Sequence, residues 1–197
     1  MRCIPALVIL ILHSGFCLSQ DTLLLINGKE LVADSARFQG YYVDIFKQHP
    51  KKTKHLNAYR VFSIRHSSGL EEVIYAKDPS DPLDFSPEEM RLFIKGEQDA
   101  ERYYVNDVNK GVAFCLGSVS SLATFYGLLI PPLYSSVVGS ITPDMNRMKV
   151  SDESLRTNDI YCEGYQSTVR KKKIKNSLVA GLVGFAYGAI ALSLVLD

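Results

Sequence analysis

The chain has 197 residues, of which 47% are hydrophobic, and its 22 basic and 21 acidic side chains leave a formal charge of only +1. The basic cluster Arg170–Lys175 is accompanied by neither an aromatic platform nor a recognised nucleic-acid-binding fold, which excludes a nucleic-acid-binding protein. The average hides a division, because residues 111–143 and 176–196 carry no charge at all. Alternating polar and apolar blocks indicate an integral membrane protein in contact with the lipid bilayer.

The N-terminus has the pattern of a secretory signal. Arg2 precedes the apolar run Ile4–Leu12, and Cys17-Leu18-Ser19 offers small residues to signal peptidase. We therefore expect residues 1–19 to be a cleaved signal peptide. The alternatives are an uncleaved anchor, for which the run is short, and a lipid-modified Cys17, for which the preceding Phe16 is too bulky.

Residues 20–110 are predicted to form an extracytoplasmic β-rich domain. Processing would leave only Cys115 and Cys162 in the chain, so no disulfide framework supports this domain. Asn27-Gly28 is typical of a type I′ hairpin turn. We expect a small antiparallel meander, or a barrel curled from it, built from short apolar runs that read as strands: 22–26, 30–38, 41–46, 58–64 and 71–75.

A capped helix follows the strands. Ser86-Pro87-Glu88-Glu89 combines an N-cap serine, a proline at the first helical position and a glutamate three residues after the cap. The helix is predicted over residues 87–104, inside the extracytoplasmic domain, with Gly96 as a weak point. The fold class is therefore α+β, followed by membrane helices.

Two transmembrane helices are predicted after this domain. The first span covers residues 111–139, with a core at 112–130 that rises about 28 Å, close to the thickness of a hydrocarbon core. Pro131-Pro132 should end or bend it. Residues 140–176 form a loop, and residues 177–197 form the second span. The alternatives are a re-entrant hairpin with the prolines at its tip, and a soluble protein that buries both runs.

The orientation follows from the signal and the charges. A cleaved signal places residues 20–110 outside, so the loop 140–176 is expected in the cytoplasm. Arg170–Lys173 and Lys175 directly before the second span agree with the positive-inside rule. The same cations could instead bind anionic lipid headgroups. Helical spans favour the bacterial inner membrane, because outer membranes contain barrels.

Small residues recur along the second span. Ala180, Gly184 and Gly188 share one helix face, and Gly117 and Ser121 have the same spacing in the first span. Such residues allow two helix backbones to approach closely. They predict either packing of the two helices within one chain or self-association through Gly184 and Gly188.

The residue types that carry chemistry form no recognisable site. Asp78, Asp81 and Asp84 could ligate calcium, but their spacing does not match an EF-hand loop, and turn formation and helix N-terminal charge explain them better. His49, His55 and His66 lack cysteine partners for zinc. No serine lies in a nucleophile elbow, and no glycine-rich phosphate loop is present. We therefore assign no catalytic, cofactor-binding or metal-binding residue and no cofactor.

Four segments resemble a group of uncharacterised bacterial cell-envelope proteins: Asp21–Lys29, Arg60–Ile64, Glu72–Asp78 and the GEQDA motif Gly96–Ala100. The resemblance spans most of the chain after the signal and implies export in a bacterium, without implying an activity. GEQDA is its most distinctive motif, either an interaction surface or a kink.

The sequence favours a non-catalytic membrane-anchored envelope protein whose extracytoplasmic domain binds another envelope protein. One alternative is a small oligomeric component of a pore or transport complex with glycine-packed helices. The other is an envelope hydrolase with an unrecognised site.

Overall fold

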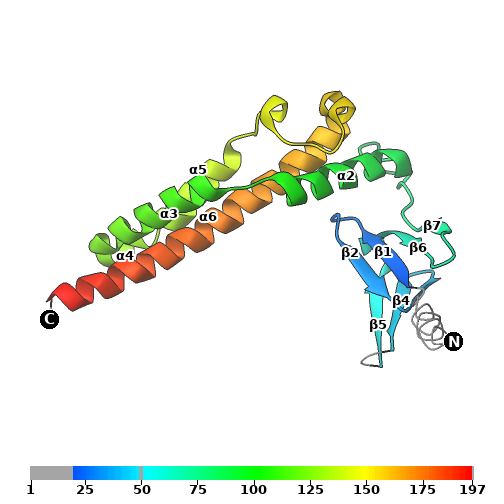
Figure 1. Ribbon diagram of the computed structural model, residues 1–197, viewed down its shortest axis with the longest axis horizontal. Coiled ribbons are helices and arrows are strands. Elements are labelled where there is room, and N and C mark those ends of the chain that lie inside the picture. Colours follow the sequence, from blue (N-terminus) through cyan, green and yellow to red (C-terminus); the bar gives the residue numbers. More distant parts are fainter. Residues whose placement is uncertain (1–19, 49–50, 197) are drawn as a thin grey trace, which may run out of the picture. The chain divides into compact units, whose positions relative to one another are not determined.

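The computed structural model describes residues 20–48 and 51–196, so the predicted signal peptide at residues 1–19 lies outside the described residues. The chain divides into two compact units, Met1–Pro87 and Glu88–Asp197. The first unit contains the strands and the second the helices (Figure 1). The predicted α+β class is therefore confirmed.

The β unit contains two antiparallel sheets. The four-stranded sheet has the order β2-β1-β6-β7 and the three-stranded sheet the order β3-β4-β5. β1 pairs with β6 as well as with its neighbour β2, so the simple meander is replaced by a two-sheet arrangement. The strands are β1 (Asp21–Leu25), β2 (Glu30–Ala33), β3 (Ser35–Gln39), β4 (Tyr42–Lys47), β5 (Lys52–Asn57), β6 (Val61–Arg65) and β7 (Glu71–Val73).

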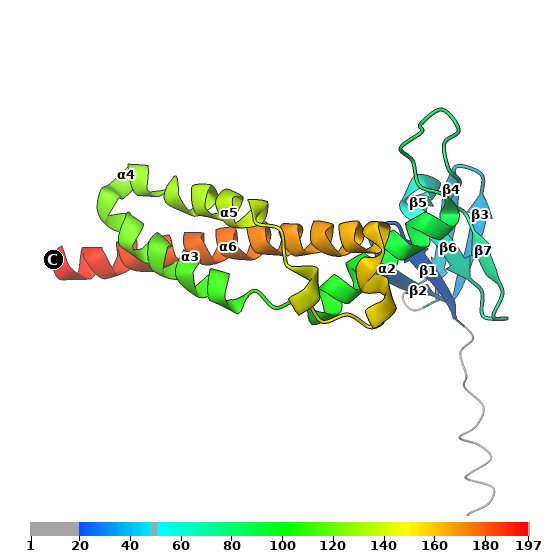
Figure 2. The same cartoon turned by 90° about the horizontal axis from the view of Figure 1, so that it is seen from above.

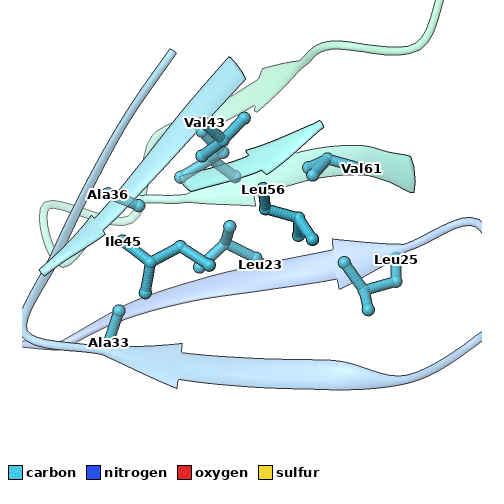
Figure 3. Close-up of a cluster of buried hydrophobic side chains, with 9 residues drawn as sticks. Leu23, Leu25, Ala33, Ala36, Val43, Ile45, Leu56 and Val61 are labelled. Carbon is cyan, nitrogen blue, oxygen red and sulfur yellow. The ribbon is translucent and has the colours of Figure 1, made fainter. Parts of the chain in front are cut away.

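One hydrophobic core joins the two sheets. Alternate residues of β1, Leu23 and Leu25, are buried, as the twofold period of a strand requires. Val43 and Ile45 of β4 come from the other sheet, and the side chains from both sheets converge in Figure 3. Because each sheet has one face to bury, their packing provides the one core of the described part of this unit, which contains no cysteine between residues 20 and 87.

Two strand predictions were incomplete. The run 30–38 is divided at Asp34, whose carboxylate accepts a hydrogen bond from the Gln48 backbone N–H at 2.5 Å. At this break the chain leaves the four-stranded sheet and enters the three-stranded sheet. β5 was missed because its sequence, KTKHLN, is almost wholly polar and only Leu56 is buried. Its backbone pairing with β4, which sequence periodicity does not report, makes it a strand.

The first hairpin turn also differs from the predicted type. In the described residues Gly28 has a φ of 73°, whereas Asn27 does not have positive φ. The Gly28 N–H donates to the Leu25 carbonyl at 3.0 Å, and the Leu25 N–H to the Lys29 carbonyl at 2.9 Å. The loop is thus three residues long with glycine in the left-handed position, rather than a two-residue type I′ turn.

Asp21, the first residue of β1, connects separate segments of the β unit through hydrogen bonds. Its buried carboxylate accepts backbone hydrogen bonds from Ala36 of β3 at 2.8 Å and from Ser67, in the turn between β6 and β7, at 2.9 Å. Burial opposes ionisation, but these hydrogen bonds, with His66 nearby, outweigh it and hold the pKa of Asp21 below its ordinary value. The charged form is therefore the one that stabilises the fold.

We expect Asp21→Ala to lower the local stability of the β unit by about 2 kcal/mol, because two backbone donors lose their acceptor. Faster hydrogen–deuterium exchange in β1 and β6 of the full-length protein measures the loss. Asp81→Ala, which removes an exposed turn carboxylate, should change exchange in these strands little. Equal protection in the wild type and Asp21→Ala would contradict the assignment.

Helix α6 (Asp159–Leu196) is the longest element of the helical unit. Its 38 residues rise about 57 Å. α2 (Pro87–Tyr103) lies along its polar first half and begins where the capping box predicts. The remaining elements are α3 (Asp107–Ser120), a 3₁₀ turn (Ser121–Ala123), α4 (Thr124–Gly127), α5 (Ile130–Ser140) and two 3₁₀ turns, Met145–Arg147 and Glu153–Thr157.

The first apolar run is a helical hairpin, so the prediction of two spanning helices was wrong. α3 runs parallel to α6, with Gly117 against Gly181, while α5 returns antiparallel, with Gly139 against Ile174. Both helices flank the second half of α6 (Figure 2). The chain turns back at residues 121–129, where Thr124 has a φ of 51°. Among the described residues, α6 is the one helix long and apolar enough to cross a membrane.

The position of the break explains the error. Pro131 and Pro132 were expected to end an outgoing helix, but they lie in the first turn of α5. Proline fits there because the first N–H groups of a helix have no carbonyl partner within it. The prolines thus start the return helix, and the reversal itself occurs just before it, at residues 121–129.

Candidate functional site

The GEQDA motif forms the crossing between α2 and α6. A Cβ on Gly96 would lie 2.1 Å from the Tyr161 carbonyl oxygen, and one on Gly164 would lie 2.1 Å from that of Phe93. Two glycines, one on each helix, therefore let the backbones touch. α2 continues through Gly96 without interruption, so the motif is neither a kink nor an exposed surface.

Asp99 is the centre of a buried polar cluster at this crossing. Its Oδ2 accepts hydrogen bonds from the Tyr161 hydroxyl at 2.6 Å, the Ser151 hydroxyl at 2.6 Å and the Ser151 N–H at 3.0 Å. Burial disfavours the charge, yet these donors outweigh it and keep the pKa of Asp99 below its ordinary value. Lys95 also lies 3.6 Å from Oδ1.

The centre of the cluster, Asp99 with Tyr161, is buried. Asp99 is 2% exposed and Tyr161 is fully buried. Their donors and acceptors are directed at each other, and Tyr165 and Ala100 pack beside them. The arrangement joins α2, α6 and the loop that contains Ser151, and its edge, at Ser151 and Lys95, reaches solvent.

The basic cluster before the apolar part of α6 has partners within the chain. Lys171 Nζ lies 3.0 Å from Oε1 of the buried Glu97. Lys172 Nζ donates to the Glu101 carbonyl at 2.6 Å, near the end of α2, and Lys173 Nζ donates to the Ile141 carbonyl at 2.7 Å, at the end of α5. Cations stabilise the partial negative charge of helix C-termini. These lysines therefore act in tertiary structure, which the sequence pattern could not distinguish from a topology signal.

The second half of the helical unit exposes an unusual amount of apolar surface. In the most apolar 18-residue stretch of α6, only 17% is buried within the protein. Exposed large apolar side chains occur on all of the helices here, at Val112, Leu116, Val119, Leu122, Phe125, Leu129, Leu133, Val137, Val179, Val183, Ile190 and Leu194. No charged residue interrupts residues 111–143 or 176–196.

Gly184 and Gly188 lie against α3. A Cβ on Gly184 would be 2.1 Å from the Phe114 carbonyl oxygen, and one on Gly188 would be 2.3 Å from that of Ser118. The small-residue stripe is thus used for packing within the chain, one of the two roles that its spacing predicts. Self-association through the same two glycines would have to displace α3.

Among the described residues, the predicted ligand residues form no group that could hold a metal ion. Asp84 Oδ2 accepts the Asp78 N–H at 2.7 Å, and Asp81 Oδ1 accepts the Leu83 N–H at 2.9 Å, so these carboxylates form turns. His55 lies beside Asp44 and His66 beside Asp21. His49 lies outside the described residues.

The β unit has a hollow of about 360 Å³ near these turns. Tyr41 and Tyr59 line it and are 74% and 80% exposed. Phe38, Tyr75 and Asp84 are among the other residues that line it. Exposed tyrosines around a hollow are typical of protein interaction surfaces. Their grouping was not evident from the sequence, because β3, the β3–β4 turn and the segment before β6 are brought together only by the fold.

The chain matches no family model, and comparison with characterised proteins and with solved structures likewise found no match.

Proposed function

We propose that this chain is a non-catalytic membrane protein of the bacterial inner membrane, in which α6 spans the bilayer and the α3–α5 hairpin inserts beside it without crossing. The apolar outer surface of these helices carries the proposal. Exposing a leucine- or valine-sized side chain to water rather than to an apolar phase costs about 1.5–3 kcal/mol each. A continuous charge-free surface of such side chains is therefore more stable in contact with lipid than in contact with water.

The lengths of the helices support partial insertion of the hairpin. α3 has 14 residues and α5 has 11, which correspond to rises of about 21 and 16 Å, less than the roughly 30 Å of a hydrocarbon core. The apolar half of α6, residues 176–196, rises about 30 Å and is long enough. In the proposed arrangement only the C-terminus of α6 reaches the opposite side.

This arrangement changes the expected position of the loop. Because α5 returns along α6, residues 142–158 are on the same side of the bilayer as α2, and so is the β unit that precedes α2. With a cleaved signal peptide that side is extracytoplasmic. The positive-inside argument for a cytoplasmic loop is weakened, because Lys171, Lys172 and Lys173 already have partners within the chain.

We assign the β unit the role of binding another envelope protein through the hollow around Tyr41 and Tyr59. The burial of Asp99 and Tyr161 supports a structural rather than a catalytic use of these polar residues. A pore made of glycine-packed copies is less well supported, since Gly184 and Gly188 contact α3.

Single reporter cysteines test the topology, in a protein whose four native cysteines are replaced by serine. The exposed residues Lys29 and Arg147 provide reporters for the β unit and the loop, and a cysteine appended after Asp197 reports on the C-terminus. In intact spheroplasts we expect an impermeant thiol reagent to label Lys29→Cys and Arg147→Cys, and the appended cysteine only after permeabilisation.

The pattern discriminates between the topologies regardless of absolute orientation. If the first apolar run spans the membrane, Lys29→Cys and the appended cysteine will react alike and Arg147→Cys will differ. That result would overturn the hairpin arrangement. Equal labelling of all three sites, in a protein that does not float with vesicles, would overturn the membrane assignment itself.

A further inference from the structure

A polar groove lies where the charge-free segments meet the charged half of α6. It has a volume of about 390 Å³ and lies between the end of α5 and one face of α6. That face presents residues at helical spacing, so their side chains point in one direction. The lining includes Ser140, Ile141, Thr142, Glu163, Gln166 and Arg170.

The groove contains one charge of each sign among its described lining residues. Glu163 and Arg170 are both exposed. No ion pair joins either of them to another described residue. The neighbouring Lys173 is buried and directed at the Ile141 carbonyl, so its charge is already used at the end of α5. The groove thus offers a separated cation and anion.

The two charges are arranged along the direction of the proposed bilayer normal. Seven residues separate Glu163 from Arg170, a rise of about 10 Å along the helix. Arg170 is the nearer of the two to the apolar segment that begins at Asn176. A zwitterionic phospholipid has the same order, because its phosphate lies next to the glycerol and its ammonium group lies farther into the water.

We propose that this groove binds the headgroup of phosphatidylethanolamine, with Arg170 on the phosphate and Glu163 on the primary ammonium. This inference rests on the proposed membrane location of α6. Arginine binds phosphate oxygens through a planar fork of donors, and Ser140, Thr142 and Gln166 supply further hydrogen-bonding groups. The acyl chains follow the exposed apolar surface formed by α5 and by Ile141 directly after it. A primary ammonium can donate to Glu163, whereas the quaternary ammonium of phosphatidylcholine cannot.

Native mass spectrometry of the full-length protein tests the site. The protein is reconstituted in vesicles of equal parts phosphatidylethanolamine, phosphatidylcholine and phosphatidylglycerol, checked for flotation with the vesicles, and released in mild detergent. We expect the wild type to retain phosphatidylethanolamine about fivefold or more over each of the other lipids. Glu163→Gln should abolish the preference for phosphatidylethanolamine over phosphatidylcholine. Arg170→Gln should reduce the retention of both phosphatidylethanolamine and phosphatidylcholine.

Lys175→Gln is the matched control, because it removes an exposed cation close to the same boundary but outside the groove. It should retain lipid as the wild type does. A floating wild-type protein that retains the three lipids equally, or that prefers the anionic phosphatidylglycerol, overturns the headgroup site while leaving the membrane proposal intact. A protein that fails to float overturns the membrane proposal instead.

Discussion

Gly96→Ala and Gly164→Ala should each destabilise the helical unit by about 2–3 kcal/mol, although alanine is the better helix former. The new methyl group would lie 2.1 Å from a backbone carbonyl oxygen of the other helix in both cases. A backbone cannot rotate aside as a flexible side chain can, so α2 and α6 must move apart. Their separation would also lengthen the hydrogen bond between Tyr161 and Asp99.

Thermal unfolding of the full-length protein in mild detergent, followed by its helical circular dichroism, measures this effect. Gly111→Ala is the matched control, because Gly111 also lies within a helix but has open space around its Cα. This control should leave the unfolding midpoint unchanged or raise it, with a gain of up to about 1 kcal/mol in the free energy of unfolding. If Gly96→Ala and Gly164→Ala behave like Gly111→Ala, the close crossing of α2 and α6 is wrong.

Asp99→Ala should cost about 3 kcal/mol of stability in the helical unit. The substitution removes the acceptor of three hydrogen bonds and leaves the fully buried Tyr161 hydroxyl without a partner. An unsatisfied buried donor costs more than the net value of the bond that it made. Hydrogen–deuterium exchange should show the largest loss of protection in α2 and at the start of α6.

The contribution of Asp99 should depend on pH with a definite sign. Its pKa is lowered in the folded protein from the ordinary value of 3.8, so the stabilisation is complete above that value and is lost as the pH falls through the folded pKa. The difference in stability between the wild type and Asp99→Ala should therefore be constant near neutral pH and shrink below about pH 4.

The double variant Asp99→Ala/Tyr161→Phe separates the hydrogen bond from other effects. Removing the hydroxyl as well as its acceptor leaves no buried donor at position 161, so the double variant should lose at least about 1 kcal/mol less than the sum of the single variants. Strict additivity would contradict a direct interaction between Asp99 and Tyr161.

Prediction from the sequence succeeded where local signals sufficed. The capping box at Ser86–Glu89 predicts the start of α2, and the apolar run 22–26 before the Asn27-Gly28 turn predicts β1. It failed for β5, whose polar residues show no periodicity, and at residues 121–129, where an apolar sequence turns back. Hydropathy reports that a segment is apolar but not whether its chain continues or reverses, because the same side chains suit lipid in either case.

Prediction of the candidate sites was also limited to what residues close in the sequence reveal. GEQDA was singled out as distinctive, but its polar residues suggested an exposed surface, whereas Glu97 and Asp99 are 4% and 2% exposed. Their partners, Lys171 and Tyr161, are more than sixty residues away in the sequence. No local pattern reveals that a glycine on each of two distant helices will bring such groups together.

The sequence by itself determined that strands precede helices, that two charge-free segments follow a polar domain and that α2 begins at Pro87, because caps, periodicity and hydropathy act between residues close in the chain. Only the tertiary structure decided that the first apolar segment is a hairpin on α6, that the basic cluster closes the ends of α2 and α5, and that Gly184 packs on Phe114. Those outcomes depend on which distant backbones come into contact.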